Sequence, residues 1–345
     1  MIYFTSDYCE GCHERILDRL ARTNYEQTPG YGTDDHCRRA AELIRRECGR
    51  EDVQVHFLVG GTQTNLTVID AALRPHQGAV CAESGHINVH ETGAVEATGH
   101  KCLTLPSADG KITAAQVAEL VRLHRTDESM EHTAQPKLVY ISNPTEYGTI
   151  YSRDELRELS RVCRELGLYL FLDGARLGYG LRCQQNDVTM ADLAELCDAF
   201  YIGGTKVGAL FGEALVVTNP GLGEDFRYIM KQRGAMLAKG RLLGIQFETL
   251  FEDGLYWQIS DHALAMAELI RRKLRSKGIP MDPESPTNQL FPVLPDPVLH
   301  RLRERFALTY MNRVDGSTSR IRICTSWATK EEDVRTLCDA LDTLL

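Results

Sequence analysis

The fold is decided by two short apolar stretches, Tyr169-Leu170-Phe171-Leu172-Asp173 and Phe200-Tyr201-Ile202-Gly203, which are separated by a helical segment. Each stretch is apolar on successive residues and then stops abruptly, which is typical of a strand that is buried on both faces of a parallel sheet. The first is followed by Gly174-Ala175-Arg176 and the second by Gly204-Thr205-Lys206. The sequence therefore predicts that two buried strands deliver a carboxylate, a guanidinium and an amine to one edge of a sheet.

Asp173, Arg176 and Lys206 together suit the binding of pyridoxal phosphate. A lysine amine forms a Schiff base with an aldehyde cofactor. An aspartate beside the pyridine nitrogen favours its protonated form, and the protonated ring withdraws electrons from a carbanion. Arg176 can hold an anionic oxygen in its fork of donors. Asp173 or Lys206 alone would also fit a solvated surface residue, but the combination at two strand ends favours the cofactor.

Length, charge and cysteine usage limit the class of protein. A chain of 345 residues can bury a large core and is expected to form one large domain with a smaller appendage. Its net charge of −9 argues against nucleic-acid binding, and no apolar run is long enough to span a membrane. Met1–Tyr8 lacks the features of a signal peptide, so we expect a cytoplasmic protein whose eleven cysteines are reduced.

Cys9-Glu10-Gly11-Cys12-His13 matches the attachment pattern of haem c and could also begin a metal site. Haem attachment requires an exported chain, and a zinc site requires a second ligand pair with metal-type spacing, which the sequence lacks. We therefore predict an N-terminal arm with two free thiols and no metal.

Short apolar strands alternate with helices through the first two thirds of the chain, which predicts a mostly parallel sheet covered by helices on both faces. Seven strands are expected, at residues 53–59, 79–82, 101–105, 138–142, 169–173, 200–203 and 214–218. Chemically distinctive residues lie at the C-terminal ends of five of them, namely the Gly60-Gly61-Thr62-Gln63 turn, His86, Asn143, Asp173 and Lys206. In such sheets ligands bind outside the C-terminal ends of the strands, so we expect these residues to share one site.

Two of these strand-end features indicate particular contacts. The glycine turn at Gly60 precedes a helix and leaves backbone N–H groups free to bind a phosphate, although glycines also serve tight strand-to-helix turns. His86 can stack on an aromatic cofactor or move a proton, although an ordinary histidine at a helix start would look the same.

The composition of the sequence changes after Pro220, where residues 226–251 are rich in Arg, Lys, Gly and Met. We expect a long helix over residues 226–251 with a bend at Gly240, and a second long helix that Ser260 caps. Strands are expected at residues 289–294 and 320–324, and a capping box at Thr329 precedes the terminal helix. The predicted organisation is an N-terminal arm (1–33), a large cofactor-binding domain (34–251) and a small C-terminal α/β domain (252–345).

The chain resembles the threonine aldolase and β-eliminating lyase family of fold-type I pyridoxal-phosphate enzymes over nearly its whole length. The motifs that carry the resemblance are Leu172-Asp173-Gly174-Ala175-Arg176-Leu177, the lysine 33 residues after Asp173, Gly61-Thr62-Gln63-Thr64-Asn65 and Gly85-His86-Ile87. One segment differs: where family members carry Glu-Asn-Thr-His, this chain has Ser142-Asn143-Pro144-Thr145-Glu146 and lacks the histidine.

The resemblance implies roles for individual residues. Lys206 forms the Schiff base, Asp173 pairs with the pyridine nitrogen and His86 stacks on the ring. The candidate contacts of the phosphate and the rest of the cofactor are Gly61, Thr62, Gln63, Thr205, Asn143 and Arg176. Ser6, Arg176 and Arg322 are expected to hold the carboxylate of an amino-acid substrate, with Arg320 competing for the role of Arg322. Family members place the site between subunits of a homodimer or homotetramer, so Tyr31 and a cation from residues 231–241 are expected to come from a neighbouring chain.

The expected reaction is the cleavage of L-threonine or L-allo-threonine to glycine and acetaldehyde, with His86, His90 or a water as the base for the β-hydroxyl. The alternatives are a β-eliminating lyase or an aminotransferase that uses the same cofactor, and a binding protein that has kept the fold without catalysis.

Overall fold

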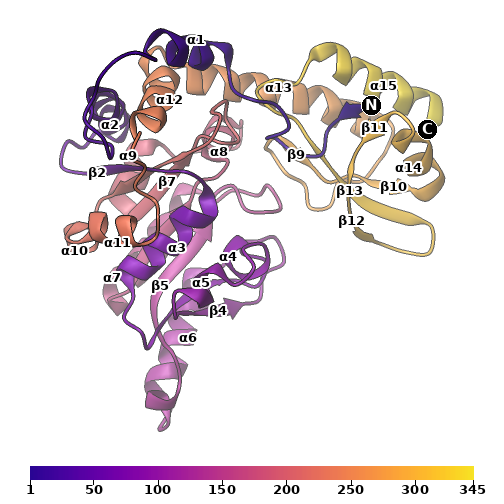
Figure 1. Ribbon diagram of the computed structural model, residues 1–345. Helices are drawn as coiled ribbons and strands as arrows, with labels where there is room; N and C mark the ends of the chain where they lie inside the picture. The colour runs from indigo at the N-terminus through magenta and orange to yellow at the C-terminus, as the bar shows by residue number, and fades with distance from the viewer.

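Seven strands form the central sheet, in the spatial order β2-β8-β7-β6-β5-β3-β4 (Figure 1). The computed structural model describes residues 1–345. Neighbouring strands are parallel except where β8 is involved, because β8 runs antiparallel to both β7 and β2. The predicted mostly parallel seven-stranded sheet is therefore confirmed. In spatial order the strands are β2 (Gln54–Leu58), β8 (Glu213–Val217), β7 (Ala199–Gly203), β6 (Tyr169–Asp173), β5 (Gln135–Ser142), β3 (Gln77–Ala82) and β4 (Lys101–Leu105).

Helices cover both faces of this sheet (Figure 1). Those of one face are α2 (Asp35–Cys48), α6 (Ala114–Thr126), α7 (Arg153–Leu166), α8 (Leu177–Arg182), α9 (Met190–Leu196) and α12 (Arg241–Glu252). Those of the other face are α3 (Gly61–Ala72), α4 (His86–Val89), α5 (Ala94–Ala97), α10 (Pro220–Gly223) and α11 (Phe226–Gln232). None of the protein's helices combines the length and the apolar composition needed to cross a bilayer.

The two faces explain why the strands of the sheet read as continuous apolar runs. In β6, Leu170 and Leu172 pack into the larger core on one face, whereas Phe171 packs into the core on the other. Successive side chains of a strand point to opposite faces, so both faces of β6 need apolar residues. The apolar run ends at Asp173, which is also buried but has hydrogen-bond donors around its carboxylate.

A second, smaller sheet lies beside the large domain (Figure 1). Its strands and their neighbours are β9 (Gln289–Leu290), β10 (Val293–Pro295), β12 (Thr309–Arg313) and β13 (Thr318–Cys324), with α13 (Leu255–Ser276), α14 (Asp296–Arg303) and α15 (Glu331–Leu344) packed around a third core. The first residues of the chain also belong here, because β1 (Ile2–Tyr3) pairs in parallel with β11 (Phe306–Ala307). The exact domain boundaries near residues 33 and 252 stay a prediction.

The structure corrects three predictions in the C-terminal half. Residues 226–251 form two helices rather than one bent helix, because α11 ends before Gly234, whose φ of +70° leaves the helical region. The helix expected to start at Ser260 starts at Leu255, after Gly254, and the Ser260 hydroxyl instead donates to Tyr256 O within that helix. Thr329 does not cap the terminal helix, because its hydroxyl accepts the Ser326 N–H.

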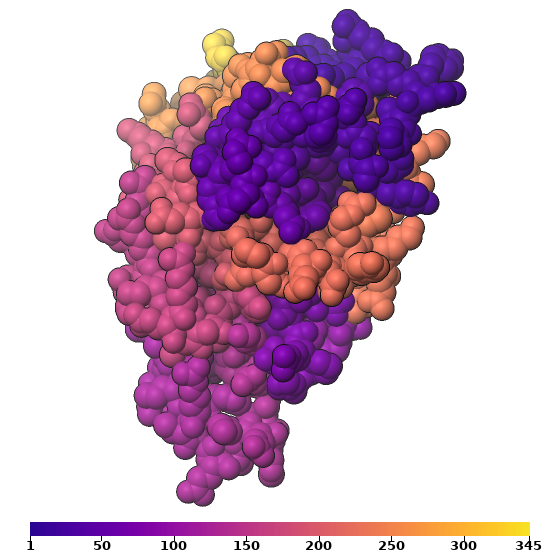
Figure 2. All heavy atoms as spheres, turned by 90° about the vertical axis from the view of Figure 1, so that its left-hand side faces the viewer, coloured from indigo at the N-terminus to yellow at the C-terminus, as the bar shows by residue number.

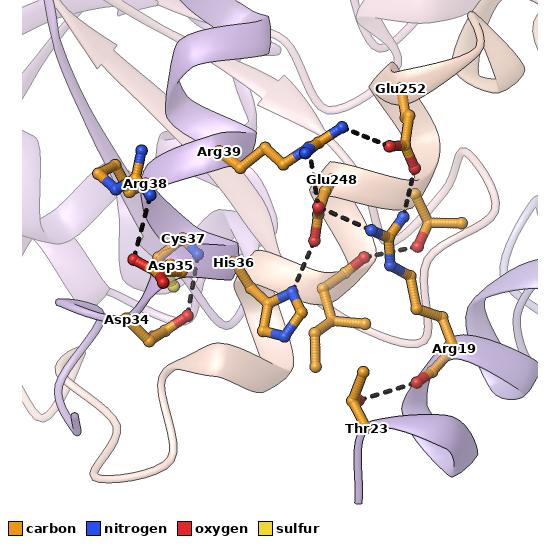
Figure 3. Close-up of polar contacts among 12 residues, drawn as sticks. Arg19, Thr23, Asp34, Asp35, His36, Cys37, Arg38, Arg39, Glu248 and Glu252 are labelled. Atoms are coloured by element: carbon orange, nitrogen blue, oxygen red, sulfur yellow. Dashed lines mark hydrogen bonds and ion pairs between the residues drawn. The ribbon is translucent and has the colours of Figure 1, made fainter. Parts of the chain in front are cut away.

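An ion-pair network holds the N-terminal helices against α12 (Figure 3). The Glu248 carboxylate is almost inaccessible, with 3% of its side chain exposed, and it binds Arg19 Nη2 at 2.7 Å and His36 Nδ1 at 2.7 Å. Arg19 lies on α1 (Glu14–Arg22), and Glu252 binds both Arg19 and Arg39. The network explains why the N-terminal segment lies over the segment that contains α12 in Figure 2.

We expect His36→Gln to destabilise the protein more at about pH 6 than at about pH 9. Burial alone would lower the pKa of His36, but the hydrogen bonds and charges of Glu26 and Glu248 outweigh burial and raise it. A raised folded-state pKa stabilises the fold below the unfolded value, and this stability is lost as the pH rises through the folded value. The loss at acidic pH should be about 1–2 kcal/mol in urea unfolding.

The matched control for that experiment is His76→Gln, because His76 is an exposed histidine. An equal loss of unfolding free energy at both pH values for His36→Gln would contradict a protonated His36 in the folded protein.

Candidate active site

Two cavities open at the C-terminal edge of the central sheet. The first, of about 330 Å³, is lined by the Gly60–Thr62 turn, Asp173 and Thr205, and we call it the Asp173 cavity. The second, of about 640 Å³, is lined by His90 and Arg322, and we call it the Arg322 cavity. The two share five lining residues, which are Tyr8, His86, Glu146, Arg176 and Lys206. The cavities therefore form one continuous site around Lys206.

This site brings together most of the residues that the sequence singles out. Those that line one or both cavities are Lys206, Asp173, Arg176, His86, His90, Gly61, Thr62, Thr205 and Arg322. They converge because β2, β3, β5, β6 and β7 are parallel and end at the same edge of the sheet. The structure thus gives four of the five strand-end features, the Gly60 turn, His86, Asp173 and Lys206, the predicted common location, and Asn143 is the exception.

Asp173 is held as an anion by four donors. Its Oδ2 accepts from Tyr140 OH at 2.6 Å and Asn65 Nδ2 at 3.0 Å, and its Oδ1 accepts from Tyr201 OH at 2.5 Å and Ala175 N at 2.9 Å. Burial alone would raise the pKa of Asp173, but the hydrogen bonds from Tyr140 and Tyr201 outweigh it and lower the pKa. A buried carboxylate in this state can stabilise a cation that binds next to it.

Asn65 links this carboxylate to the histidine of the site. Its Nδ2 donates both to Asp173 Oδ2 and to Glu91 Oε1, the latter at 2.7 Å, and Glu91 Oε1 also contacts His86 Nδ1 at 2.7 Å. Burial would lower the pKa of His86, but the hydrogen bond to Glu91 and the charge of Asp173 raise it. The chain His86–Glu91–Asn65–Asp173 fixes the orientation of the imidazole ring.

Lys206 carries the only amine that lines the two cavities. Burial is the main cause that lowers the pKa of this amine, and the charge of Arg176 adds to the effect, while Asp7 and Asp173 oppose it. Lys206 forms no ion pair within 4.0 Å. A lysine with a lowered pKa is more often neutral, and the neutral amine is the nucleophile for a carbonyl compound.

Arg176 is already paired with a carboxylate that the sequence did not indicate. Asp7, which is fully buried, accepts from Arg176 Nε at 2.7 Å and Nη2 at 3.0 Å, and Asn288 Nδ2 donates to the same carboxylate at 3.0 Å. Nη1 of Arg176 makes no hydrogen bond to the protein. Arg176 is thus held in place by Asp7 while Nη1 stays available to a ligand in the cavities.

The Gly60–Thr62 turn offers a set of free donors. It leads into α3, and no side chain caps this helix. The backbone N–H groups of Gly61, Thr62 and Gln63 donate to no acceptor in the protein. The first N–H groups of a helix, together with the helix dipole, bind anions such as phosphate.

Glu213 is an unexpected neighbour of this anion site. It starts β8, and because β8 is antiparallel its first residue lies at the edge where the other strands end. Its carboxylate accepts from Thr205 Oγ1 at 2.9 Å and Gly204 N at 2.9 Å. Burial raises the pKa of Glu213 to about 7, although the hydrogen bond from Gly204 opposes this. A partly protonated Glu213 repels a nearby anion less than a full carboxylate would.

Several predicted residues lie outside the two cavities. Gln63 braces the turn, with Oε1 accepting from Val59 N and Nε2 donating to Arg233 O. Asn143 is buried and its Oδ1 accepts from Tyr151 N. Ser6 Oγ lies 3.2 Å from Cys9 Sγ, and the ring of Tyr31 lies 4.5 Å from Lys231 Nζ on another part of the surface.

The structure distinguishes the two arginines of β13. Arg322 lines the Arg322 cavity, where its Nη2 donates to Thr5 O at 2.9 Å. Arg320 pairs with Asp282 and does not line either cavity.

The Cys9–His13 segment and the other cysteines form no metal cluster or disulfide. Cys9 is exposed, Cys12 is buried, and all eleven cysteines are unpaired. Nowhere in the protein do three or more His, Cys, Asp or Glu side chains gather as potential metal ligands.

Sequence reasoning missed six residues of the site or its support: Asp7, Tyr8, Glu91, Tyr140, Glu146 and Glu213. Only Tyr140 carried a usable signal, as a polar group within a predicted strand next to the Asp173 strand. Glu213 begins β8, and the other four lie in turns or the N-terminal arm, where a polar residue is ordinary.

Comparisons with known proteins converge on one family. Residues 4–312 match the family described as β-eliminating lyase. Low specificity L-threonine aldolase from a Pseudomonas species is 33% identical over 341 residues, which cover 97% of this chain and 95% of that protein. The same enzyme from Pseudomonas aeruginosa is 31% identical over 339 residues, with 97% and 95% covered.

Solved structures give the same result. The threonine aldolase of Leishmania major is 46% identical and superposes with a TM-score of 0.97 over 100% of this chain and 99% of that one. An aspartate aminotransferase of Thermus thermophilus, at 15% identity and a TM-score of 0.73 over 100% and 92% of the two chains, shares the fold-type I architecture. The predicted fold class is therefore confirmed.

We expect Glu213→Gln to strengthen anion binding at the Gly60–Thr62 turn, and to do so more at about pH 8 than at about pH 6. With its pKa raised to about 7, Glu213 gains charge as the pH rises and then repels the anion. Sulfate is the probe, because its own charge is constant over this range, and calorimetry of the cofactor-free protein is the measurement. Sulfate affinity in Glu213→Gln that equals the wild-type value at both pH values would contradict this role.

Proposed function

The chain belongs to the β-eliminating lyase family, and on that basis we propose that it is a pyridoxal-phosphate-dependent aldehyde-lyase that cleaves L-threonine or L-allo-threonine to glycine and acetaldehyde. The observation that carries the proposal is the convergence of the Lys206 amine, the Asp173 carboxylate and the free N–H groups of the Gly60–Thr62 turn on one cavity. We infer the substrate class from the relatives that are named threonine aldolase.

The donors and acceptors of the Asp173 cavity fit pyridoxal phosphate. The N–H groups of the turn and the Thr205 hydroxyl suit the phosphate, and the anionic Asp173 suits a protonated pyridine nitrogen. His86, which Glu91 holds by a hydrogen bond, is the candidate for stacking on the ring. When bound, pyridoxal phosphate supplies an aldehyde for amines and a ring that withdraws electrons from the substrate's Cα.

Lys206 would hold the aldehyde group of the cofactor, and a substrate amine would have to take its place. Its lowered pKa favours the neutral amine that this exchange requires. Tyr140, Tyr201 and Asn65 donate hydrogen bonds that favour the ionised form of Asp173, and this carboxylate would stabilise a protonated ring nitrogen of the bound cofactor.

Arg176 and Arg322 are the candidate anchors of the substrate carboxylate. Both line the Arg322 cavity next to Lys206, and Nη1 of Arg176 is free. Ser6 follows Thr5, whose carbonyl accepts from Arg322, so Ser6 is a further candidate. Two fixed cations hold the amino acid in one orientation, and this orientation selects which bond to Cα is broken.

We also propose a homo-oligomer with the site at the subunit interface. Tyr31 and Lys231 lie together outside the cavities of their own chain, which supports their serving the site of a neighbouring subunit.

The test of the proposed reaction is the product set from L-threonine, L-serine and L-cysteine. Acetaldehyde and glycine from L-threonine support the aldolase, whereas pyruvate and ammonia would identify a β-eliminating lyase. A keto acid formed with transfer of the amino group would identify an aminotransferase.

Lys206→Ala should lose the absorbance band of the lysine-bound cofactor and all cleavage of L-threonine, because no other amine lines the cavities. Absorbance spectra of the purified proteins are the measurement. Lys101→Ala, which removes an exposed lysine from the edge strand, is the control and should keep both. Persistence of the band in Lys206→Ala would refute the assignment.

Arg322→Ala should raise KM for L-threonine by about 10–100-fold, the value of one lost hydrogen-bonded charge contact, and should leave the cofactor band intact. Arg320→Ala is the matched control on the same strand and should keep a wild-type KM, because Arg320 lies outside the cavities. A larger effect of Arg320→Ala than of Arg322→Ala would reverse the assignment.

A further inference from the structure

Glu146 is the carboxyl group at the junction of the two cavities. It lies in the turn after β5, in the segment Ser142-Asn143-Pro144-Thr145-Glu146, and it lines both the Asp173 cavity and the Arg322 cavity. Lys206 lines both cavities as well. Glu146 is thus placed beside the junction where a bound amino acid would join the cofactor.

Only one oxygen of this carboxyl is used by the protein. Glu146 Oε1 accepts the backbone N–H of His86 at 2.9 Å and the hydroxyl of Ser142 at 2.8 Å. Oε2 makes no hydrogen bond, and it is not sealed from solvent. The two donors fix the orientation of the carboxyl, and the second oxygen remains available to a ligand in the cavities.

The surroundings of Glu146 shift its pKa upward from the ordinary value of a glutamate. Burial raises the pKa of Glu146, the hydrogen bond from Ser142 opposes this, and the charge of Asp173 raises the pKa further while that of His86 lowers it. The charge of Glu146 in turn helps to raise the pKa of the Tyr140 and Tyr151 hydroxyls. Tyr140 is hydrogen-bonded to Asp173, and Tyr151 is hydrogen-bonded to the backbone of Ile112. A base works best when its pKa lies close to the working pH.

The two histidines are less suited to act as the base. His86 has Nδ1 bound to Glu91, and although burial lowers the pKa of His86, the hydrogen bond to Glu91 and the charge of Asp173 raise it overall. His90 lines only the Arg322 cavity, and its pKa is lowered by burial and by the charge of His86. Glu83 lines only the Arg322 cavity, and Asp173 and Glu213 line only the Asp173 cavity, so Glu146 is the one carboxyl that both cavities share. With the amine of the substrate at Lys206 and its carboxylate at Arg176 and Arg322, this shared position suits contact with the third substituent of Cα.

Resting on the proposed aldolase function, we propose that Glu146 is the acid–base residue that removes the proton from the β-hydroxyl of the substrate. The hydroxyl proton moves to Glu146 Oε2, and the Cβ–O bond becomes the carbonyl of the aldehyde. The Cα–Cβ bond breaks and leaves its electron pair on Cα, a charge that bound pyridoxal phosphate would stabilise. Cα then takes up a proton, and glycine is the second product.

The experiment compares Glu146→Gln, Glu146→Ala and His90→Gln with the wild type, each loaded with cofactor, on L-threonine from about pH 5 to about pH 9. Glu146→Gln should lower kcat about 10²–10³-fold with KM changed only a few-fold, and should lose the acidic limb of the wild-type pH profile. Formate should restore part of the activity of Glu146→Ala, because it supplies an external carboxylate. His90→Gln should keep the acidic limb.

Ser142→Ala provides a second, milder variant. It removes a donor that stabilises the charged carboxyl, so the acidic limb of kcat should move to higher pH. The cofactor absorbance band and its response to glycine, which has no β-hydroxyl, should be unchanged in Glu146→Gln, and this separates a chemical role from a lost fold.

The outcomes separate the inference from the proposed function. A wild type that cleaves L-threonine together with a Glu146→Gln variant of equal kcat and an unchanged pH profile would overturn the role of Glu146 alone. The same holds if His90→Gln, and not Glu146→Gln, loses the acidic limb. A wild type that shows the cofactor band but releases no acetaldehyde would overturn both.

Discussion

The buried ion pair between Asp7 and Arg176 is the interaction on which the geometry of the site depends. It joins the N-terminal arm to the end of β6, and Asn288 joins the same carboxylate to the small domain. Removing two charges from water is costly, and only bidentate geometry with further hydrogen bonds offsets that cost. The paired contacts to Arg176 and the donor from Asn288 provide this, so three distant segments of the chain meet in one defined arrangement.

Hydrogen bonds also offset the cost of burying the carboxyl groups at the edge of the sheet. Asp173, Glu91, Glu146 and Glu213 lie close together at this edge, and each accepts hydrogen bonds from a different set of donors. Asp173 is kept ionised by hydroxyl and amide donors, whereas burial raises the pKa of Glu146 and Glu213. Environment thus separates carboxyl groups of similar intrinsic acidity into a fixed anion and groups that can exchange a proton.

The sequence by itself determined the central sheet and the core of the site. Apolar runs that end at Asp173 and Lys206 can be read locally, because burial on both faces imposes apolar residues and a strand end releases that constraint. The parallel order of strands then places their ends at one edge, so Gly61, His86, Asp173 and Lys206 meet without any knowledge of individual contacts. The predicted helix starts at Ser260 and Thr329 were wrong, because a hydroxyl can bond to several nearby backbone groups besides the first N–H groups of a helix.

Only the tertiary structure decided which partner each polar group takes. Asp7 and Arg176 are 169 residues apart in sequence, and nothing local links them. Arg320 and Arg322 lie two residues apart on β13 and therefore point to the same face of the strand. Arg320 pairs with Asp282 and Arg322 bonds to Thr5, and these partners from other segments decide which arginine lines the cavity. Glu146 and Glu213 become members of the site because a turn and an antiparallel strand bring them there. The pattern of a sequence fixes what must be buried, but hydrogen bonds between distant segments exist only once the chain has folded.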